Sequence, residues 1–176
     1  MLIFSVFFFG YYLISSLENK RSYSENKSIK PTTDSTMLDS VLLFIMDHEG
    51  FSDTVYLCPS GNRTIGYGHL LKNNEYCIRV DKSAAYSLLK KDFFERLNVV
   101  KGKKFKINYY QTLAIAHFVY CLGESRLEKM QKHIEMGDVD SYLMRFNKFY
   151  TKDSILIESK NLTKQRQFEK QLFNKQ

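Results

Sequence analysis

Apolar residues recur at the spacing of an amphipathic helix in the segment from residue 37 to residue 50. Four of them lie at i, i+3, i+4 and i+7: Leu38, Val41, Leu42 and Ile45. Ser35 or Thr36 is a suitable N-cap residue before them, and Gly50 is a suitable stop after them. The pattern predicts a helix that carries Glu49 at its C-terminal end.

The helical spacing stops after Gly50, and residues 51–80 combine short β-prone pieces with turn residues. The β-prone pieces are 54–57 and 63–67, and the segment also holds glycines at 61, 66 and 68. Glycine and polar residues between two such pieces are typical of a hairpin. We therefore expect a small hairpin sheet, with the TIGYGH segment of residues 64–69 as a tight hairpin within it.

Helical patterns return in the rest of the chain. Asp81 is a suitable cap for a helix whose apolar positions form one stripe: Tyr86, Leu89, Phe93, Leu97 and Val100. Asn108 and Gln111 form a capping pair for the next helix, which is apolar on nearly all sides and ends at Gly123. Three shorter amphipathic segments follow at about 126–136, 138–150 and 162–174. This order predicts an α+β fold with a small sheet lobe and a larger, mostly helical lobe.

The first 36 residues differ in character from the rest. Residues 2–17 form an apolar run without a polar face, which is short for a transmembrane helix of roughly 20 residues but suits a signal-peptide core or a short anchor. Lys20 and Arg21 follow the run, and no basic residue precedes it. Residues 18–36 have few groups to bury and are typical of a flexible linker. We expect an exported domain, 37–176, on the periplasmic or cell-wall side, either cleaved free or held at the inner membrane by residues 2–17.

Charge and cysteine content narrow the possible functions. A formal net charge of +7 and a pI near 9.2 favour an anionic partner, such as nucleic acid, a membrane surface or a cell-wall polymer. No segment has the pattern of a recognition helix or a base-stacking strand, so a nucleic-acid partner is not expected. Cys58, Cys77 and Cys121 show no C-x-x-C or paired Cys/His spacing, so a structural zinc site is not expected either.

One segment places an acid, a thiol and a hydroxyl at a spacing that suits cleavage of a glycosidic bond. Glu49 ends the first helix, Cys58 follows nine residues later, and Thr64 follows six residues after that. The reaction needs a proton donor on one side of the bond and a group on the other side that activates water or stabilises positive charge. Glu49 suits the donor, because partial burial raises the pKa of a glutamate. Taken singly, Glu49 is an ordinary helix-end glutamate and Thr64 an ordinary strand residue.

Taken together, these residues resemble the active-site segment of the phage lysozymes (endolysins) of glycoside hydrolase family 24. The matching pieces are HEG at 48–50, Tyr56, Gly61 and TIGYGH at 64–69. The resemblance covers about residues 37–174, because VDKSAAYSLLKKDF, INYYQTLAIAHFVYCLGES and NLTKQRQFEKQLF are similar to three of the family's helices. It implies a lysozyme-like two-lobe fold that hydrolyses the β-1,4 bond between N-acetylmuramic acid and N-acetylglucosamine in peptidoglycan, without cofactor or metal.

The resemblance also implies roles for single residues. Glu49 would be the general acid, and Thr64 would help to hold the attacking water. The family's usual aspartate falls on Cys58, as in a subset of membrane-tethered endolysins, so a thiolate would act as base, nucleophile or electrostatic stabiliser. An ordinary thiol is mostly protonated at neutral pH, so the site must favour the ionised form, and Arg63 is the nearest candidate for doing so.

Cys121 is a second departure from the family, which usually carries Asn or Gln at this position. A disulfide from Cys58 to Cys77 or Cys121 would cage the thiol, as happens in some cysteine-bearing endolysins. Leu70 and Tyr120 match positions at which the family contacts the glycan, with a role as ordinary core side chains as the alternative.

Two further residues are expected to serve the architecture. His69 should anchor the hairpin to the larger lobe, and Arg166 should be a surface or lobe–lobe ion-pair partner. The leading prediction is a monomeric muramidase that lyses or remodels the cell wall. The competing reading is a peptidoglycan-binding module that lost hydrolysis when cysteine came to occupy position 58.

Overall fold

The computed structural model describes residues 33–58, 61–73, 75–150 and 155–176. The apolar run of residues 2–17 and nearly all of the expected linker lie outside the described residues. Within the described part of the chain, no helix is both long and apolar enough to cross a membrane.

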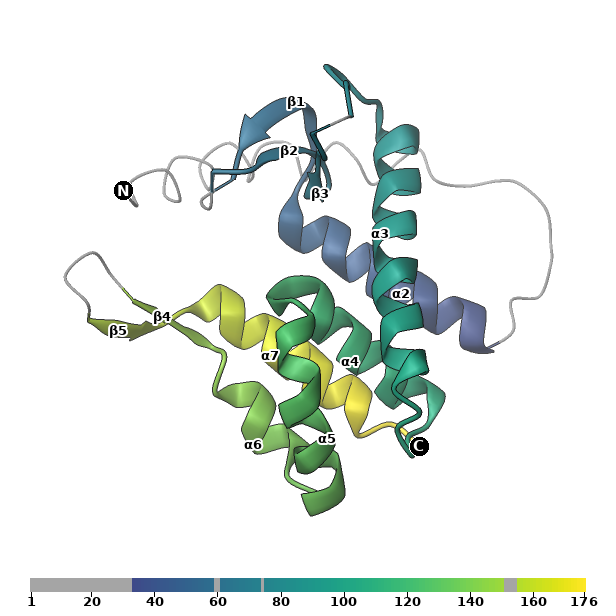
Figure 1. Ribbon diagram of the computed structural model, residues 1–176, viewed down its shortest axis with the longest axis vertical. Helices are drawn as coiled ribbons and strands as arrows, with labels where there is room; N and C mark the ends of the chain where they lie inside the picture. The colour runs from purple at the N-terminus through teal and green to yellow at the C-terminus, as the bar shows by residue number, and fades with distance from the viewer. Residues whose placement is uncertain (1–32, 59–60, 74, 151–154) are drawn as a thin grey trace.

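The chain forms two lobes, a small sheet lobe and a larger helical lobe, with helix α3 extending from one to the other (Figure 1). The elements follow one another in this order: α2 (Thr33–Glu49), β1 (Ser52–Leu57), β2 (Arg63–Gly66), β3 (His69–Leu70), α3 (Lys82–Gly102), α4 (Tyr109–Leu122), a short 3-10 turn (Glu124–Arg126), α5 (Leu127–Met136), α6 (Val139–Met144), β4 (Lys148–Tyr150), β5 (Leu156–Glu158) and α7 (Lys160–Phe173). The predicted α+β architecture is confirmed.

Helix α2 begins at Thr33, two residues before the earlier of the two caps expected from the sequence. The predicted apolar stripe is otherwise correct, because Val41, Leu42 and Ile45 are fully buried. The helix ends where Gly50 adopts a φ of +71°, a conformation that glycine reaches without steric cost.

The sheet lobe is a three-stranded antiparallel sheet in the order β1-β2-β3. Tyr56 lies opposite Thr64 in the β1–β2 ladder, and Thr64 lies opposite Leu70 in the β2–β3 ladder. Irregular register between Ser52 and Tyr56 marks a bulge in β1. The TIGYGH segment therefore forms the predicted tight hairpin, with Gly66 and Gly68 at positive φ.

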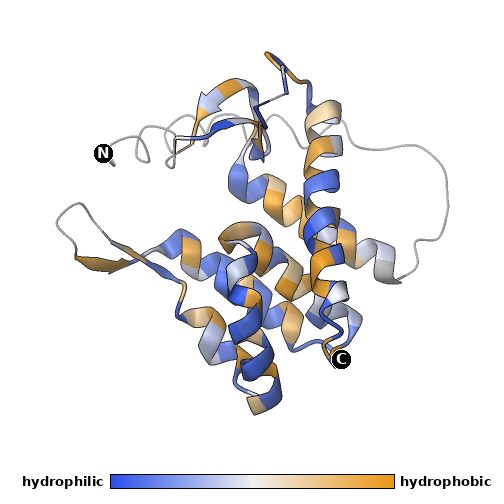
Figure 2. Cartoon of the chain, viewed as in Figure 1, coloured by the Kyte–Doolittle hydropathy of each residue, from blue (hydrophilic) through white to orange (hydrophobic). Residues whose placement is uncertain are grey.

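Helices α3 and α4 begin at the caps that the sequence predicted. The Asp81 side chain accepts a hydrogen bond from the backbone N–H of Ala84, and Asn108 and Gln111 form a complete capping box. Residues 112–119 of α4 are all buried, because α4 packs against α2, α3 and α7. Figure 2 shows the apolar residues gathered along α2, α3 and α4, and again on the β4–β5 hairpin.

The segment after α5 departs from the prediction of one helix over about 138–150. Helix α6 stops at Met144, and β4 then pairs with β5 in an antiparallel hairpin, with Phe149 opposite Ile157. The strand pattern of β4 covers only three residues, and its pairing partner is supplied by a segment the sequence analysis left unassigned. Such a short piece carries little periodicity of its own, so the ambiguity between helix and strand is expected.

Candidate active site

Glu49 lies against the turn of the β2–β3 hairpin. A Cβ atom added to Gly68 would lie 3.4 Å from Oε2 of Glu49, and Gly68 has a φ of +90°. The turn that meets the carboxylate therefore has a backbone conformation that favours glycine. This contact joins the HEG and TIGYGH motifs, which the sequence placed only near one another along the chain.

The surroundings of Glu49 favour its protonated form. The residue keeps an accessible face, yet the protein around its carboxyl group removes solvent and raises its pKa above the ordinary value. The nearby His117 opposes this shift to a smaller extent. A glutamate with a raised pKa can hold a proton for donation close to neutral pH.

Cys58 is partly buried directly after β1, and its backbone N–H donates a hydrogen bond of 2.9 Å to the carbonyl oxygen of Asn62. Tyr56 connects this residue with Glu49. The pKa of the Tyr56 hydroxyl is raised by burial and then by the charges of Glu49 and Cys58, so the phenol lies within electrostatic reach of both groups. The sequence identified Tyr56 as a motif residue but predicted no role for it in the site.

Thr64 is buried in β2, with an exposed fraction of only 2%. Its hydroxyl donates a hydrogen bond of 3.1 Å to the carbonyl oxygen of Asn62. The same carbonyl accepts from the backbone N–H of Cys58, so Asn62 joins the two predicted site residues. With its proton directed to Asn62, the Thr64 oxygen keeps lone pairs that can accept a hydrogen bond from a water.

Arg63 is exposed and lies opposite Leu57, the neighbour of Cys58, in the β1–β2 ladder. Its expected effect on the Cys58 thiol remains a prediction. No disulfide joins Cys58, Cys77 and Cys121, all three of which lie among the described residues. The caged form is therefore not the form seen in this structure.

Leu70 and Tyr120, the two predicted glycan contacts, differ in exposure. Leu70 is 51% exposed, which argues against the alternative of an ordinary core side chain. Tyr120 packs partly buried against the core, and its hydroxyl donates to the carbonyl oxygen of Tyr67 over 3.3 Å. Burial and the charge of Glu49 both raise the pKa of Tyr120, so its phenol stays protonated beside the acid.

His69 holds the hairpin against α3, as the sequence analysis predicted. Its Nδ1 lies 2.7 Å from Oδ2 of Asp92 on α3, and its Nε2 lies 3.4 Å from Oε2 of Glu75. The hydrogen bond with Asp92 is the largest of the influences that raise the pKa of His69. His69 is only 5% exposed, so this pair fixes the sheet lobe to the long helix at a buried point.

Arg166 corrects the expectation of a surface or lobe–lobe partner. It is fully buried in α7, where Nη2 lies 2.7 Å from Oε1 of Glu169, and its guanidinium stacks over the Phe118 ring. Glu169 also contacts Nδ1 of His117 at 2.7 Å. This cluster was not predicted from the sequence. The i, i+4 spacing of His117 and Cys121 on one helix would have predicted that these two side chains lie next to each other.

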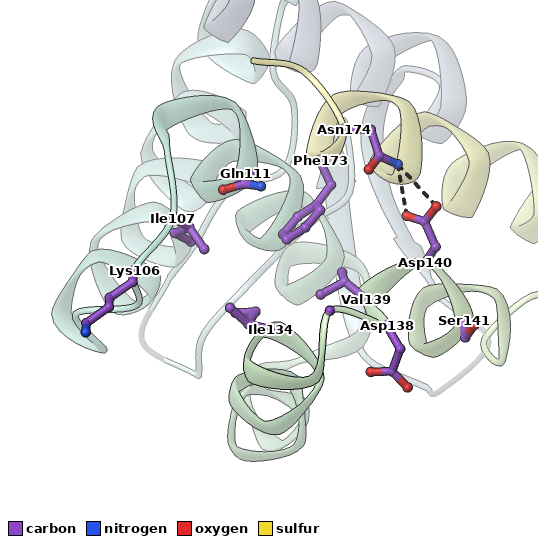
Figure 3. Close-up of a pocket in the computed structure, with 11 residues that line it drawn as sticks. Lys106, Ile107, Gln111, Ile134, Asp138, Val139, Asp140, Ser141, Phe173 and Asn174 are labelled. Carbon is purple, nitrogen blue, oxygen red and sulfur yellow. Dashed lines mark hydrogen bonds between the residues drawn. The ribbon is translucent and has the colours of Figure 1, made fainter.

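A separate hollow of about 440 Å³ lies in the helical lobe, between the start of α4, the α5–α6 junction and the end of α7 (Figure 3). None of the predicted site residues lines it. Its acidic groups already have partners, because Asp138 contacts His133 and Asp140 binds Asn174 and Lys170. The predicted site around Glu49 therefore lies elsewhere than this hollow.

Residues 46–169 match the model of the family described as phage lysozyme. The matched segment is more than half of the chain. The chain belongs to the phage lysozyme family. It is therefore a glycoside hydrolase of the muramidase class, and peptidoglycan is its substrate.

Solved structures agree on the fold. The muramidase domain of SpmX from Asticaccaulis excentricus matches with a TM-score of 0.68 at 20% identity, over 78% of this chain and 96% of that domain. An endolysin from Escherichia coli O157:H7 phage FAHEc1 matches with a TM-score of 0.63 at 18% identity, over 85% of this chain and 96% of the endolysin. The active form of the P1 phage endolysin Lyz matches with a TM-score of 0.57 at 16% identity, over 80% of this chain and 93% of the endolysin. No curated protein gives a significant match.

Proposed function

We propose that this chain cleaves the β-1,4 bond between N-acetylmuramic acid and N-acetylglucosamine, with Glu49 as the general acid. The observation that carries the proposal is the packing of the Glu49 carboxylate against Gly68, in surroundings that raise its pKa. The raised pKa favours the protonated form, whose proton can be donated to the leaving oxygen of the glycosidic bond.

Cys58 is proposed as the anionic group opposite Glu49, and Thr64 as the residue that holds the attacking water. The shared contacts of Cys58 and Thr64 with Asn62, and the coupling of Tyr56 to both Glu49 and Cys58, support this grouping. Leu70 and Tyr120 are proposed to contact the glycan, Leu70 through an exposed apolar side chain and Tyr120 through its ring beside the acid.

Loss of turbidity of chloroform-treated cells tests the general acid. Glu49→Gln should reduce the lysis rate at least a hundredfold, because the amide has the same shape and cannot donate a comparable proton. Glu95→Gln is the matched control, since Glu95 is exposed on α3, and it should keep full activity. Full lysis by Glu49→Gln would contradict the assignment. Binding of the unmodified chain to sacculi without lysis would instead support the inactive-module reading.

A pair of substitutions tests the role of Cys58. Cys58→Asp should retain lysis, because a carboxylate replaces one anion by another, whereas Cys58→Ser should lose most of it. Cys77→Ser is the control thiol and should be neutral. If Cys58→Ser lyses as fast as the unmodified chain, the side chain at position 58 does not take part in the reaction.

We further propose that the domain acts as a monomer on the outer side of the inner membrane, with residues 2–17 as an export signal or anchor. The apolar character of that run and the net charge of +7, which suits an anionic wall, support this placement. Fractionation of cells that express the full chain or residues 37–176 would test it. The full chain should reach the membrane or periplasmic fraction, and the shorter chain should stay in the cytoplasm.

A further inference from the structure

A second group of titratable side chains lies where α4 packs against α7. Sγ of Cys121 lies 3.9 Å from Nε2 of His117, within reach of a sulfur hydrogen bond, and Nδ1 of the same ring lies 2.7 Å from Oε1 of Glu169. Arg166 holds the same carboxylate oxygen at 2.7 Å. Thiol, imidazole and carboxylate thus follow one another in the order that activates a nucleophile.

The four residues differ in how deeply they are buried, and the difference suits activation of the thiol. His117, Glu169 and Arg166 have exposed fractions of 1%, 0% and 0%, so their geometry is fixed by packing. Cys121 is only partly buried. A buried imidazole beside a partly buried thiol is the arrangement of a reactive cysteine rather than of a structural one.

The surroundings of His117 favour the charged form of its imidazole. Burial alone would lower the pKa of His117, but the Cys121 thiol and the Glu169 carboxylate together outweigh burial and raise it to about 10. Other titratable groups also face the cluster. They are Tyr120 on α4, Glu49 and His48 on α2, and, through Tyr120, Asp92 on α3.

Two other functions of the cluster fit the geometry less well. The possible metal-ligand atoms of Cys121, His117 and Glu169 lie within 4.8 Å of one another, but Nδ1 of the ring and the Glu169 carboxylate already contact each other at 2.7 Å. Acyl transfer needs N–H donors for an oxyanion, and Cys121 lies in the last turn of α4, where the backbone groups without helical partners are carbonyl oxygens.

We propose that Cys121, His117 and Glu169 form an activated-thiol centre, and that Cys121 is a site of oxidation by small hydroperoxides. The thiolate sulfur attacks one peroxide oxygen, so that an S–O bond forms and the O–O bond breaks. Sulfur loses two electrons and becomes a sulfenic acid, and the peroxide is reduced. The departing oxygen leaves as water, or as an alcohol from an alkyl hydroperoxide, with a proton from the His117 imidazolium.

The consequence for wall lysis rests on the proposed function. Tyr120 feels the charges of both Glu49 and Cys121, so an oxidised sulfur would lie next to the side chain proposed to contact the glycan. Oxidation of Cys121 should therefore slow lysis, and a thiol reductant should restore it.

The test measures oxidation of each cysteine in the full chain. The chain is exposed to hydrogen peroxide at pH 6.0 and pH 8.5, and the thiols that survive are alkylated after unfolding and quantified by peptide mass spectrometry. Cys77 is the internal control, because it has the same intermediate burial and its sulfur contacts the backbone carbonyl of Arg79 instead of an imidazole.

Cys121 should be oxidised at least tenfold faster than Cys77 at pH 6.0, and the difference between the two rates should narrow at pH 8.5. His117→Gln should slow oxidation of Cys121 at pH 6.0 at least tenfold. If Cys121 and Cys77 are oxidised at equal rates at pH 6.0, the proposal is wrong, and this comparison needs no variant that might unfold.

The thiol measurement is independent of lysis. A chain that fails to lyse cells because Glu49 is not the general acid would still show fast oxidation of Cys121. Conversely, an active muramidase in which Cys121 and Cys77 oxidise alike would overturn only the activated-thiol centre.

Discussion

At the scale of single residues, the pKa values of Glu49 and His69 are shifted by their surroundings. Burial raises the pKa of Glu49, and His117, from another helix, acts against that shift. The pKa of His69 is raised chiefly by one carboxylate, that of Asp92. Substituting His117 or Asp92 should therefore shift the pKa of Glu49 or His69, respectively, without replacing the titrating residue itself.

The pH profile of lysis should report the coupling between Glu49 and His117. Activity should fall as the pH rises through the raised pKa of Glu49, because the general acid loses its proton. His117→Gln removes a positive charge that lowers this pKa, so the alkaline side of the profile should move to higher pH. The profile is measured by turbidity loss at constant ionic strength. An alkaline side that does not move in His117→Gln would show that His117 does not affect the pKa of Glu49.

The His69–Asp92 pair should stabilise the fold in a pH-dependent way. Because the folded pKa of His69 is raised, its contribution is fully present below the unfolded value of 6.5 and is lost as the pH rises through the folded pKa. Asp92→Asn should lower the free energy of unfolding by about 2 kcal/mol at pH 5.5, and by less at pH 9.5. Asp53→Asn, which removes an exposed partner of Arg79, should cost well under about 1 kcal/mol at both pH values. Urea unfolding at the two pH values measures both.

At the scale of elements, the three-stranded sheet and its turns contain glycines whose replacement has different costs. Gly66 and Gly61 both have positive φ, at +67° and +83°. A Cβ on Gly66 would lie 2.9 Å from Cβ of Ala85 on α3, whereas a Cβ on Gly61 would meet nothing within 4 Å. The hairpin therefore packs against α3 at a point where no side chain fits.

Gly66→Ala should lower the free energy of unfolding by about 3 kcal/mol, because it combines a strained φ with overpacking against a helix. Gly61→Ala carries the φ strain alone and should cost about 1 kcal/mol. Thermal unfolding followed by circular dichroism compares the two variants. Equal costs would show that the close approach to α3 is relieved by a small shift of the hairpin.

At the scale of the whole molecule, α4 and α7 are joined by a buried ion pair as well as by apolar packing. Glu169 neutralises Arg166 and also binds His117, which lies 52 residues away in the chain. Removing one member of a buried pair is costly because the remaining charge stays without its counter-ion.

Glu169→Gln should therefore lower the free energy of unfolding by about 3 kcal/mol or more. Asp47→Asn is the matched control, since Asp47 forms an exposed pair with Lys164 on the same helix α7, and it should cost less than about 1 kcal/mol. Urea unfolding at pH 7 provides the comparison. A loss below about 1 kcal/mol for Glu169→Gln would mean that the pair contributes little to the packing of α7.

The local sequence by itself determined the helix caps at Asp81 and Asn108, the stops at Gly50 and Gly123, and the tight hairpin of residues 64–69. Each of these depends on groups a few residues apart, so the chain carries the information locally. The motif spacing also brought Glu49, Cys58 and Thr64 into one hypothesis before any contact was known.

Only the tertiary structure decided which distant groups meet. It placed Gly68 against the Glu49 carboxylate, paired the short strands β4 and β5, and buried Arg166 with Glu169 and His117 beside Cys121. These contacts join separate segments of the chain, and no periodic pattern in the sequence predicts which segments meet. The motif predicted site residues in the sheet lobe, whereas the cluster of Cys121, His117 and Glu169 depends on the packing of α4 on α7.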